Sequence, residues 1–136
     1  MTMVNSASSD PGPGNAPGYA KYPEYQVTMA PFKGRVRVHL ADLLLADSHS
    51  AILLTETDHS PVYYLPRADV RFELLEAMER STYCPFKGHA SYWRVAGRAA
   101  QHSEPIVWGY ECPFDEVSSL SKYVAFYSDR VNLEAD

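Results

Sequence analysis

The chain has 136 residues, which is enough for one domain with a single hydrophobic core. Hydrophobic residues make up 46% of it, and its ten tyrosines, five phenylalanines and two tryptophans favour strands over helices. The formal net charge of −5 gives the chain no attraction to polyanions. We therefore expect neither a nucleic-acid partner nor binding to an anionic membrane.

The two cysteines, Cys84 and Cys112, are too few for the disulfide scaffold of a small secreted domain. They form no CxxC pair, which argues against structural zinc, and the five histidines show no metal-binding spacing. No segment approaches the roughly 18 apolar residues of a membrane span, and no cleavable leader is evident. The sequence thus predicts a cytoplasmic protein without a metal or a cofactor, and it leaves the oligomeric state open.

The N-terminal segment differs from the rest of the chain in composition. Residues 6–18 are almost entirely Ser, Gly, Pro, Ala, Asn and Asp, which bury too little apolar surface to offset the entropy of ordering the backbone. We expect a disordered tail over residues 1–18 and a single β-rich domain over residues 19–136.

The first half of the expected domain reads as a series of short strands. Residues 35–40 alternate polar and apolar side chains, which is the period of a half-buried strand with Val36, Val38 and Leu40 facing inward. Turn-rich stretches at 41–42, 47–50 and 57–60 separate further strand-like runs. These runs are 43–46, 51–56 and 61–65, and their spacing fits a β-meander.

One helix is predicted after Pro66, between Arg67 and Met78, where Val70, Leu74 and Met78 recur at four-residue spacing. Three more strand-like runs follow, and a fourth lies at the end of the chain. They are 89–95, 106–110, 123–127 and 130–134. The expected fold is therefore mainly β, with about eight strands and one short helix.

A motif in the second half resembles a known family. The run Cys84-Pro-Phe-Lys-Gly-His-Ala-Ser-Tyr-Trp93 is similar to the signature of the bacterial and fungal family called domain of unknown function 427. Further blocks that resemble the family lie on both sides of this run, in the order expected for the family along residues 34–134. Among them are Tyr63-Tyr64-Leu65-Pro66 and Trp108-Gly109-Tyr110. The resemblance implies two antiparallel sheets of the β-tent type without zinc, and it implies no activity. The family is sometimes labelled as nucleotidyltransferases. This sequence lacks the Gly-Ser dyad and the paired aspartates that metal-bound nucleotide chemistry would need.

Cys84, Lys87 and Glu56 are the candidate catalytic residues. Lys87 follows Cys84 by three residues, and a lysine near a thiol favours a nucleophilic thiolate. Pro85 stiffens the intervening backbone, while Gly88 permits a tight turn or a close approach by a ligand. The alternative is a buried structural cysteine with Lys87 pointing to solvent.

Four aromatic residues on different predicted strands are the candidate ligand-binding set, namely Tyr64, Tyr92, Trp108 and Tyr110. With Lys87 and Gly88 beside them, they are expected to line a pocket that binds a small molecule or a modified side chain. The alternative interpretation is an ordinary aromatic core between two sheets. Two classes of function therefore stay open: a binding module with an aromatic pocket, and a small enzyme that uses Cys84 or the pair of Lys87 and Glu56.

Overall fold

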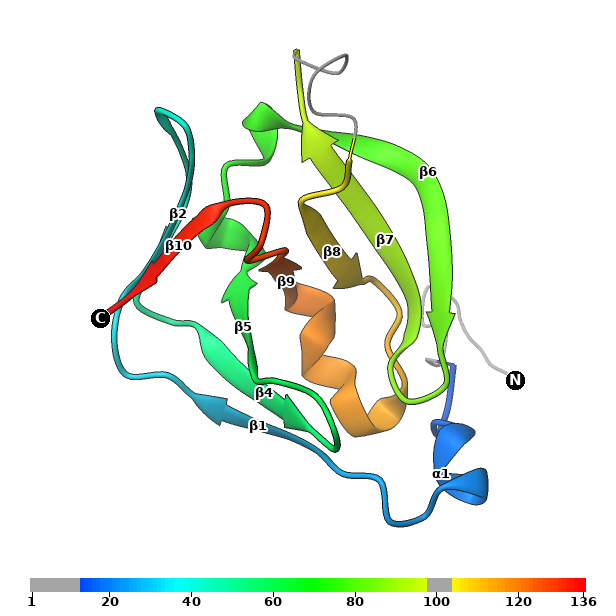
Figure 1. The fold of residues 1–136 in the computed structure, drawn as a ribbon. Helices are drawn as coiled ribbons and strands as arrows, with labels where there is room; N and C mark the ends of the chain where they lie inside the picture. Colours follow the sequence, from blue (N-terminus) through cyan, green and yellow to red (C-terminus); the bar gives the residue numbers. More distant parts are fainter. Residues whose placement is uncertain (1–12, 98–103) are drawn as a thin grey trace.

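The structure is a computed structural model that describes residues 13–97 and 104–136, where ten strands form two antiparallel sheets (Figure 1). The strands are β1 (Val27–Pro31), β2 (Val36–Leu40), β3 (Leu43–Ser48), β4 (Ile52–Glu56), β5 (Val62–Pro66), β6 (Leu75–Cys84), β7 (Gly88–Val95), β8 (Val107–Tyr110), β9 (Tyr123–Phe126) and β10 (Asn132–Ala135). The helical segments in this part of the chain are short: α1 (Gly18–Lys21), and the 3-10 segments η1 (Arg67–Asp69), η2 (Phe72–Leu74) and η3 (Asp115–Lys122).

The larger sheet has seven strands in the order β1-β4-β5-β9-β8-β7-β6, and the smaller one has three in the order β10-β2-β3. All the strand pairs are antiparallel. The mainly β fold with two antiparallel sheets is thus confirmed. The β-tent type, which the resemblance implied, stays a prediction.

The two faces of the seven-stranded sheet carry two separate hydrophobic clusters. Successive side chains of a strand point to opposite faces, so Leu65 and Tyr64 on β5 belong to different clusters. The first cluster joins Leu65 to Val38 and Leu45 of the smaller sheet and forms the core between the sheets. The second cluster includes Tyr64 and lies on the other face, where η3 packs against it; Figure 1 shows the strands of the large sheet surrounding η3.

The predicted strands correspond to β2, β3, β4, β5, β7, β8, β9 and β10, with ends displaced by a few residues. The β-meander is wrong, because the chain leaves the small sheet after β3 and enters the large one at β4. Two strands were not predicted. These are β1, which begins before the expected start of the alternating pattern, and β6, an edge strand of mostly exposed polar residues.

The helix predicted between Arg67 and Met78 is also wrong. The segment forms η1, η2 and the start of β6, with Val70 extended between the two 3-10 turns. Val70 makes an antiparallel bridge with Ala46, and Leu75 pairs with Val95. These long-range pairings bury both side chains and satisfy the backbone, so they prevail over the local four-residue spacing.

The expected disordered tail differs from the structure at its end. Gly14 accepts a hydrogen bond from the amide of Asp115, the amide of Ala16 donates to the Glu116 carboxylate, and the amide of Gly18 donates to the carbonyl of Pro85. The domain therefore includes residues that were assigned to the tail. Residues 1–12 of the expected tail lie outside the described part of the chain.

Candidate functional site

The predicted site residues gather on the face of the large sheet that η3 covers in part. The second cluster contains Tyr64, Tyr92 and Tyr110 as buried members, with Trp108 and Cys84 half-buried beside them. They come from four different strands, β5, β6, β7 and β8. The sheet thus brings together residues that are up to 46 positions apart in the sequence, as Tyr64 and Tyr110 are.

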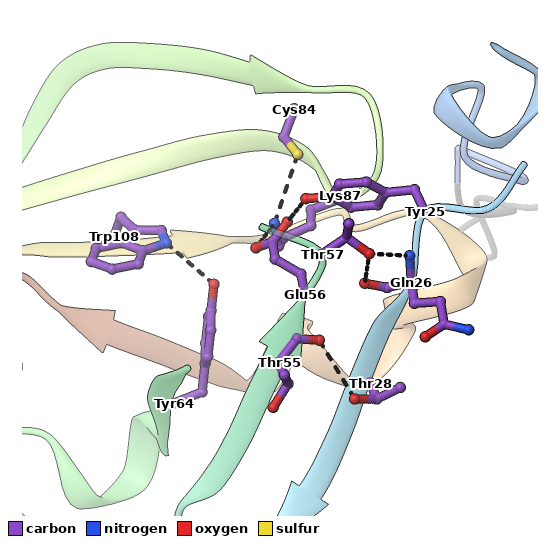
Figure 2. Close-up of polar contacts among 10 residues, drawn as sticks. All are labelled: Tyr25, Gln26, Thr28, Thr55, Glu56, Thr57, Tyr64, Cys84, Lys87 and Trp108. Atoms are coloured by element: carbon purple, nitrogen blue, oxygen red, sulfur yellow. Dashed lines mark hydrogen bonds and ion pairs between the residues drawn. The ribbon is translucent and has the colours of Figure 1, made fainter. Parts of the chain in front are cut away.

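Three of the rings lie in one row across the sheet. Tyr64 pairs with Ala125, Ala125 with Trp108, and Trp108 with Tyr92. The small side chain of Ala125 lets the flanking rings meet edge to face, with centroids 6.2 Å apart. The indole N–H of Trp108 donates to the hydroxyl of Tyr64 at 3.3 Å, as Figure 2 shows.

The hydroxyls of Tyr64 and Tyr110 are neutral hydrogen-bonding groups. Burial raises the pKa of Tyr64 well above its ordinary value, and the bond from Trp108 opposes this only in part. Burial also raises the pKa of Tyr110, with the nearby Tyr64 and Cys84 adding to the effect. The hydroxyl of Tyr92 lies 2.6 Å from that of Thr82 on the neighbouring β6. A tyrosine hydroxyl can both donate and accept a hydrogen bond, so the hydroxyls on this face are available to recognise polar atoms.

The turn between β6 and β7 carries Lys87. Cys84 and Gly88 pair across the two strands, and the amide of Lys87 donates to the carbonyl of Cys84 at 3.3 Å. Gly88 has a φ of +122°, and a Cβ atom there would lie 3.3 Å from the carbonyl oxygen of Cys112. A glycine is needed at this position both for its backbone conformation and for the close approach of the neighbouring chain.

Lys87 points inward and forms an ion pair with Glu56, at the end of β4 (Figure 2). The Nζ–Oε1 distance is 2.7 Å, and the side chains are only 7% and 12% exposed. The alternative in which Lys87 points to solvent is therefore wrong. The ammonium also lies 3.9 Å from the sulfur of Cys84, so the three candidate catalytic residues form one connected group.

The second oxygen of the Glu56 carboxylate accepts a hydrogen bond from the hydroxyl of Tyr25. Burial raises the pKa of Glu56, but the bonds from Lys87 and Tyr25 outweigh burial and hold it below its ordinary value. Glu56 is therefore a carboxylate at neutral pH. For Tyr25, burial and the bond to this carboxylate both raise the pKa.

Tyr25 is a site residue that the sequence reasoning missed. It precedes β1 in a segment without strand or helix periodicity, so no pattern placed it on the sheet face. Its ring stacks on Phe86 of the β6–β7 turn at a centroid distance of 3.9 Å. The signal that was available is the group of three tyrosines at 19, 22 and 25, which is unusual beside a Pro- and Gly-rich segment.

The structure shows a cavity at one edge of this face. Its volume is about 250 Å³, and it is lined by Trp108 together with Tyr63, Tyr127 and Asp129. The ring of Tyr127 lies 4.6 Å from that of Trp108, centroid to centroid. The other three predicted rings do not line this cavity, so Trp108 is the member of the predicted set that joins the two regions.

Several other features bear on the chemistry of the chain. Within residues 13–97 and 104–136, no group of three or more His, Cys, Asp or Glu side chains is arranged to hold a metal ion. Cys84 and Cys112 are both free thiols. Across the same ranges, none of the helices has the length and apolar character required to cross a membrane.

Comparison with known proteins gives a family without an assigned activity. A search of curated proteins finds no match. One family profile matches residues 28–136, which is most of the chain and includes Glu56, Cys84, Lys87 and Trp108. The chain therefore belongs to the family described as a domain of unknown function (DUF427).

Proposed function

We propose that the chain binds a small molecule on the aromatic face of the large sheet. The planar, apolar part of the ligand stacks beside Trp108, and its polar part faces the pair of Glu56 and Lys87. The observation that carries this proposal is a nearly buried ion pair on the same sheet face as a half-buried tryptophan with hydrogen-bonding neighbours. Apolar walls with a few convergent polar groups are the usual composition of a small-molecule site.

The ion pair supports a role beyond stability. Removing two charges from water costs free energy. Replacing a buried ion pair with apolar residues therefore often leaves the stability of a protein unchanged or increases it. Packing alone therefore does not account for Glu56 and Lys87 among the apolar side chains of this face. A ligand with one hydrogen-bond donor and one acceptor, such as an amide or a ring with an adjacent N–H and carbonyl, matches the two charges together.

The aromatic residues support a flat ligand. Trp108 is half-buried, so part of the indole ring remains available for contact. Aromatic rings pair in offset or edge-to-face geometry, and such pairs contribute about 0.5–1.5 kcal/mol beyond the burial of their area. The neutral hydroxyls of Tyr64 and Tyr110 add groups that recognise polar atoms at the rim of a ring.

The test uses the two tryptophans, which lie on opposite faces of the sheet. Purified wild-type protein is incubated with a small-molecule extract of the cells that produced it, and retained molecules are identified by native mass spectrometry. Trp108→Ala should lose the retained molecule, whereas Trp93→Ala, which truncates a half-buried tryptophan packed on the first cluster, should keep it. Retention by Trp108→Ala at the wild-type level, or no retained molecule in the wild type, would contradict the proposal.

A second candidate function is catalysis by Cys84, and one distance favours it. The ammonium of Lys87 is 3.9 Å from the sulfur, a position from which it stabilises a negative charge on a nucleophile. If this is its role, Cys84 should react with iodoacetamide faster than the exposed Cys112, although it is less accessible. The difference should vanish in the double variant Lys87→Met with Glu56→Gln, which removes both charges. Equal or slower reaction of Cys84 in the wild type would exclude this candidate.

We also infer a cytoplasmic setting without polyanionic partners. Two free cysteines support a reducing compartment, and the net charge of −5 supports partners other than nucleic acid or anionic lipid.

A further inference from the structure

Residues 13–25, called the strap below, precede the region that matches the family profile and lie against the candidate site. The profile begins at residue 28, and the strand ladders of the two sheets begin at Val27. The strap is therefore an addition to the sheets, and none of their strand pairs includes a strap residue. Figure 1 shows α1, which belongs to the strap, beside the β6–β7 turn.

Phe86 is the main anchor of the strap. Tyr25 stacks on its ring at 3.9 Å, and Tyr19 meets it edge to face at 5.0 Å. Phe86 is only 7% exposed as a result of this packing. Gly18 lies so close that a Cβ atom there would be 2.6 Å from the ring, so the strap fits against Phe86 only with a glycine at this position.

Backbone hydrogen bonds fix the strap to the same two elements that border the site. Gly18 donates to the carbonyl of Pro85 at 3.0 Å, directly beside Phe86 and Lys87. At the start of η3, the amide of Asp115 donates to Gly14 at 2.9 Å, and the Glu116 carboxylate accepts from Ala16 at 2.9 Å. The strap thus bridges the turn that carries Lys87 and the helical segment that covers the sheet face.

The hydroxyl of Tyr25 connects the strap to the ion pair. It donates to Oε2 of Glu56, while Lys87 holds Oε1 of the same carboxylate (Figure 2). Figure 2 shows Tyr25 and Trp108 on opposite sides of Lys87. A ligand that reaches the ion pair from the side of Trp108 therefore meets the strap at the far end.

We propose that the strap is a detachable wall of the site and that Tyr25 is the positioning residue that orients Glu56 toward Lys87. With the strap in place, both oxygens of Glu56 are held, and Lys87 is shielded on the side of Phe86. With the strap displaced, Glu56 loses one of its two partners and Lys87 becomes accessible, while the sheets stay paired. This inference rests on the same site as the proposed function, but it makes no use of a ligand.

Lysine acetylation tests the wall. The chain has four lysines. Lys87 is buried, with 5% of the whole residue exposed, whereas Lys33 and Lys122 are exposed and serve as internal references. Native full-length protein is treated briefly with an acetylating N-hydroxysuccinimide ester, and each lysine is quantified by peptide mass spectrometry. Tyr25→Ala and Gly18→Ala should raise the labelling of Lys87 relative to the references by about fivefold or more, which corresponds to roughly 1 kcal/mol.

Tyr22→Ala is the matched control, because Tyr22 belongs to the same strap, is 54% exposed and lies farther from Phe86 than Tyr25 does, with ring centroids 6.5 Å apart against 3.9 Å. It should leave the labelling of Lys87 unchanged. Amide exchange at Gly18 reports whether the strap has left Pro85 in each variant. The wall is refuted if Lys87 stays protected in Tyr25→Ala and Gly18→Ala while the Gly18 amide exchanges freely. Because the readout is labelling, failure of the small-molecule proposal leaves this result interpretable.

Tyr25→Phe tests the positioning role, since phenylalanine keeps the stacking on Phe86 and removes only the hydroxyl. The Glu56 carboxyl is followed through a pH titration by carbon-13 NMR. Its pKa should rise in Tyr25→Phe, because one of the two bonds that favour the carboxylate is gone, and it should not move in Tyr22→Phe. An unchanged titration in Tyr25→Phe would refute the positioning role.

Discussion

Lys87 shows at the level of a single residue how an inward-pointing charge depends on its partner. The side chains of Lys87 and Glu56 are nearly buried, and their atoms are 2.7 Å apart. Removing one partner leaves the other charge buried without compensation. We expect Lys87→Met to lower the free energy of unfolding by about 3–5 kcal/mol.

The control for that variant is the double change Lys87→Met with Glu56→Gln, which removes both charges. It should recover most of the loss, because no unpaired charge remains. Urea denaturation at pH 7 measures both variants. A single variant as stable as the wild type would mean that the pair is solvated and that Lys87 is less buried than the structure shows.

Glu56 also links stability to pH. Its pKa is below the ordinary value in the folded protein, so the folded state holds the carboxylate more strongly than the unfolded state does. This contribution is complete above the unfolded value of about 4.3 and is lost as the pH falls through the folded value. In urea unfolding between pH 3 and pH 7, the wild type should therefore lose more stability on acidification than Glu56→Gln does. Parallel curves would show that Glu56 does not contribute.

The predicted aromatic residues Tyr64, Tyr92, Trp108 and Tyr110 do lie together on this face, but the sequence did not predict their contacts. Alternation along a strand puts Trp108 and Tyr110 on one side, and this much follows from residue order. The ion pair joins residues 31 positions apart, and Tyr25 is equally far from Glu56. Such contacts depend on how strands and strap meet in three dimensions, which local periodicity does not encode.

At the scale of elements, the β6–β7 hairpin depends on Gly88. Its φ of +122° is unfavourable for any residue with a side chain, and an added Cβ would also crowd the carbonyl of Cys112. We expect Gly88→Ala to cost about 1–3 kcal/mol. Because the same turn carries Lys87, the variant should also disturb the ion pair with Glu56.

Gly97 provides the comparison for Gly88. It also has a positive φ, of +78°, but among the residues that the structure describes none would lie within 4 Å of a Cβ there. Gly97→Ala should therefore cost less than Gly88→Ala, because only the backbone conformation is strained. Thermal denaturation of the two variants checks the order, and the reverse order would show that crowding near Cys112 is relieved by a shift of the chain.

Pairing between distant segments explains why the helix prediction failed. The apolar spacing of Val70, Leu74 and Met78 is that of a helix, yet Val70 bridges Ala46 and Leu75 pairs with Val95. The edge strand β6 was missed for a related reason: most of its residues are exposed, so it has no apolar pattern of its own. Its pairing with β7 is what makes it a strand.

At the scale of the whole molecule, the passage of the chain from the small sheet at β3 to the large sheet at β4 brings the site residues together. Without it, Glu56 at the end of β4 would not lie on the large sheet with Trp108 and Tyr92. Sequence patterns indicate turns such as 47–50 but not whether the next strand joins the same sheet. The class of fold was therefore predictable from composition and alternation, whereas the division into seven and three strands was not.

The last prediction concerns the redox state of the whole chain. Cys84 is half-buried on the sheet face and Cys112 is exposed in the segment after β8, and both are free thiols. A protein stabilised by two packed clusters has no need of a disulfide, and a reducing compartment would keep both thiols. Thiol titration of unfolded protein that has never been reduced should therefore count two groups, and Cys84→Ser and Cys112→Ser should each count one. A count near zero in the wild type would mean that the cysteines are oxidised as the protein is isolated. It would overturn the proposed cytoplasmic setting together with the free thiol that catalysis by Cys84 requires.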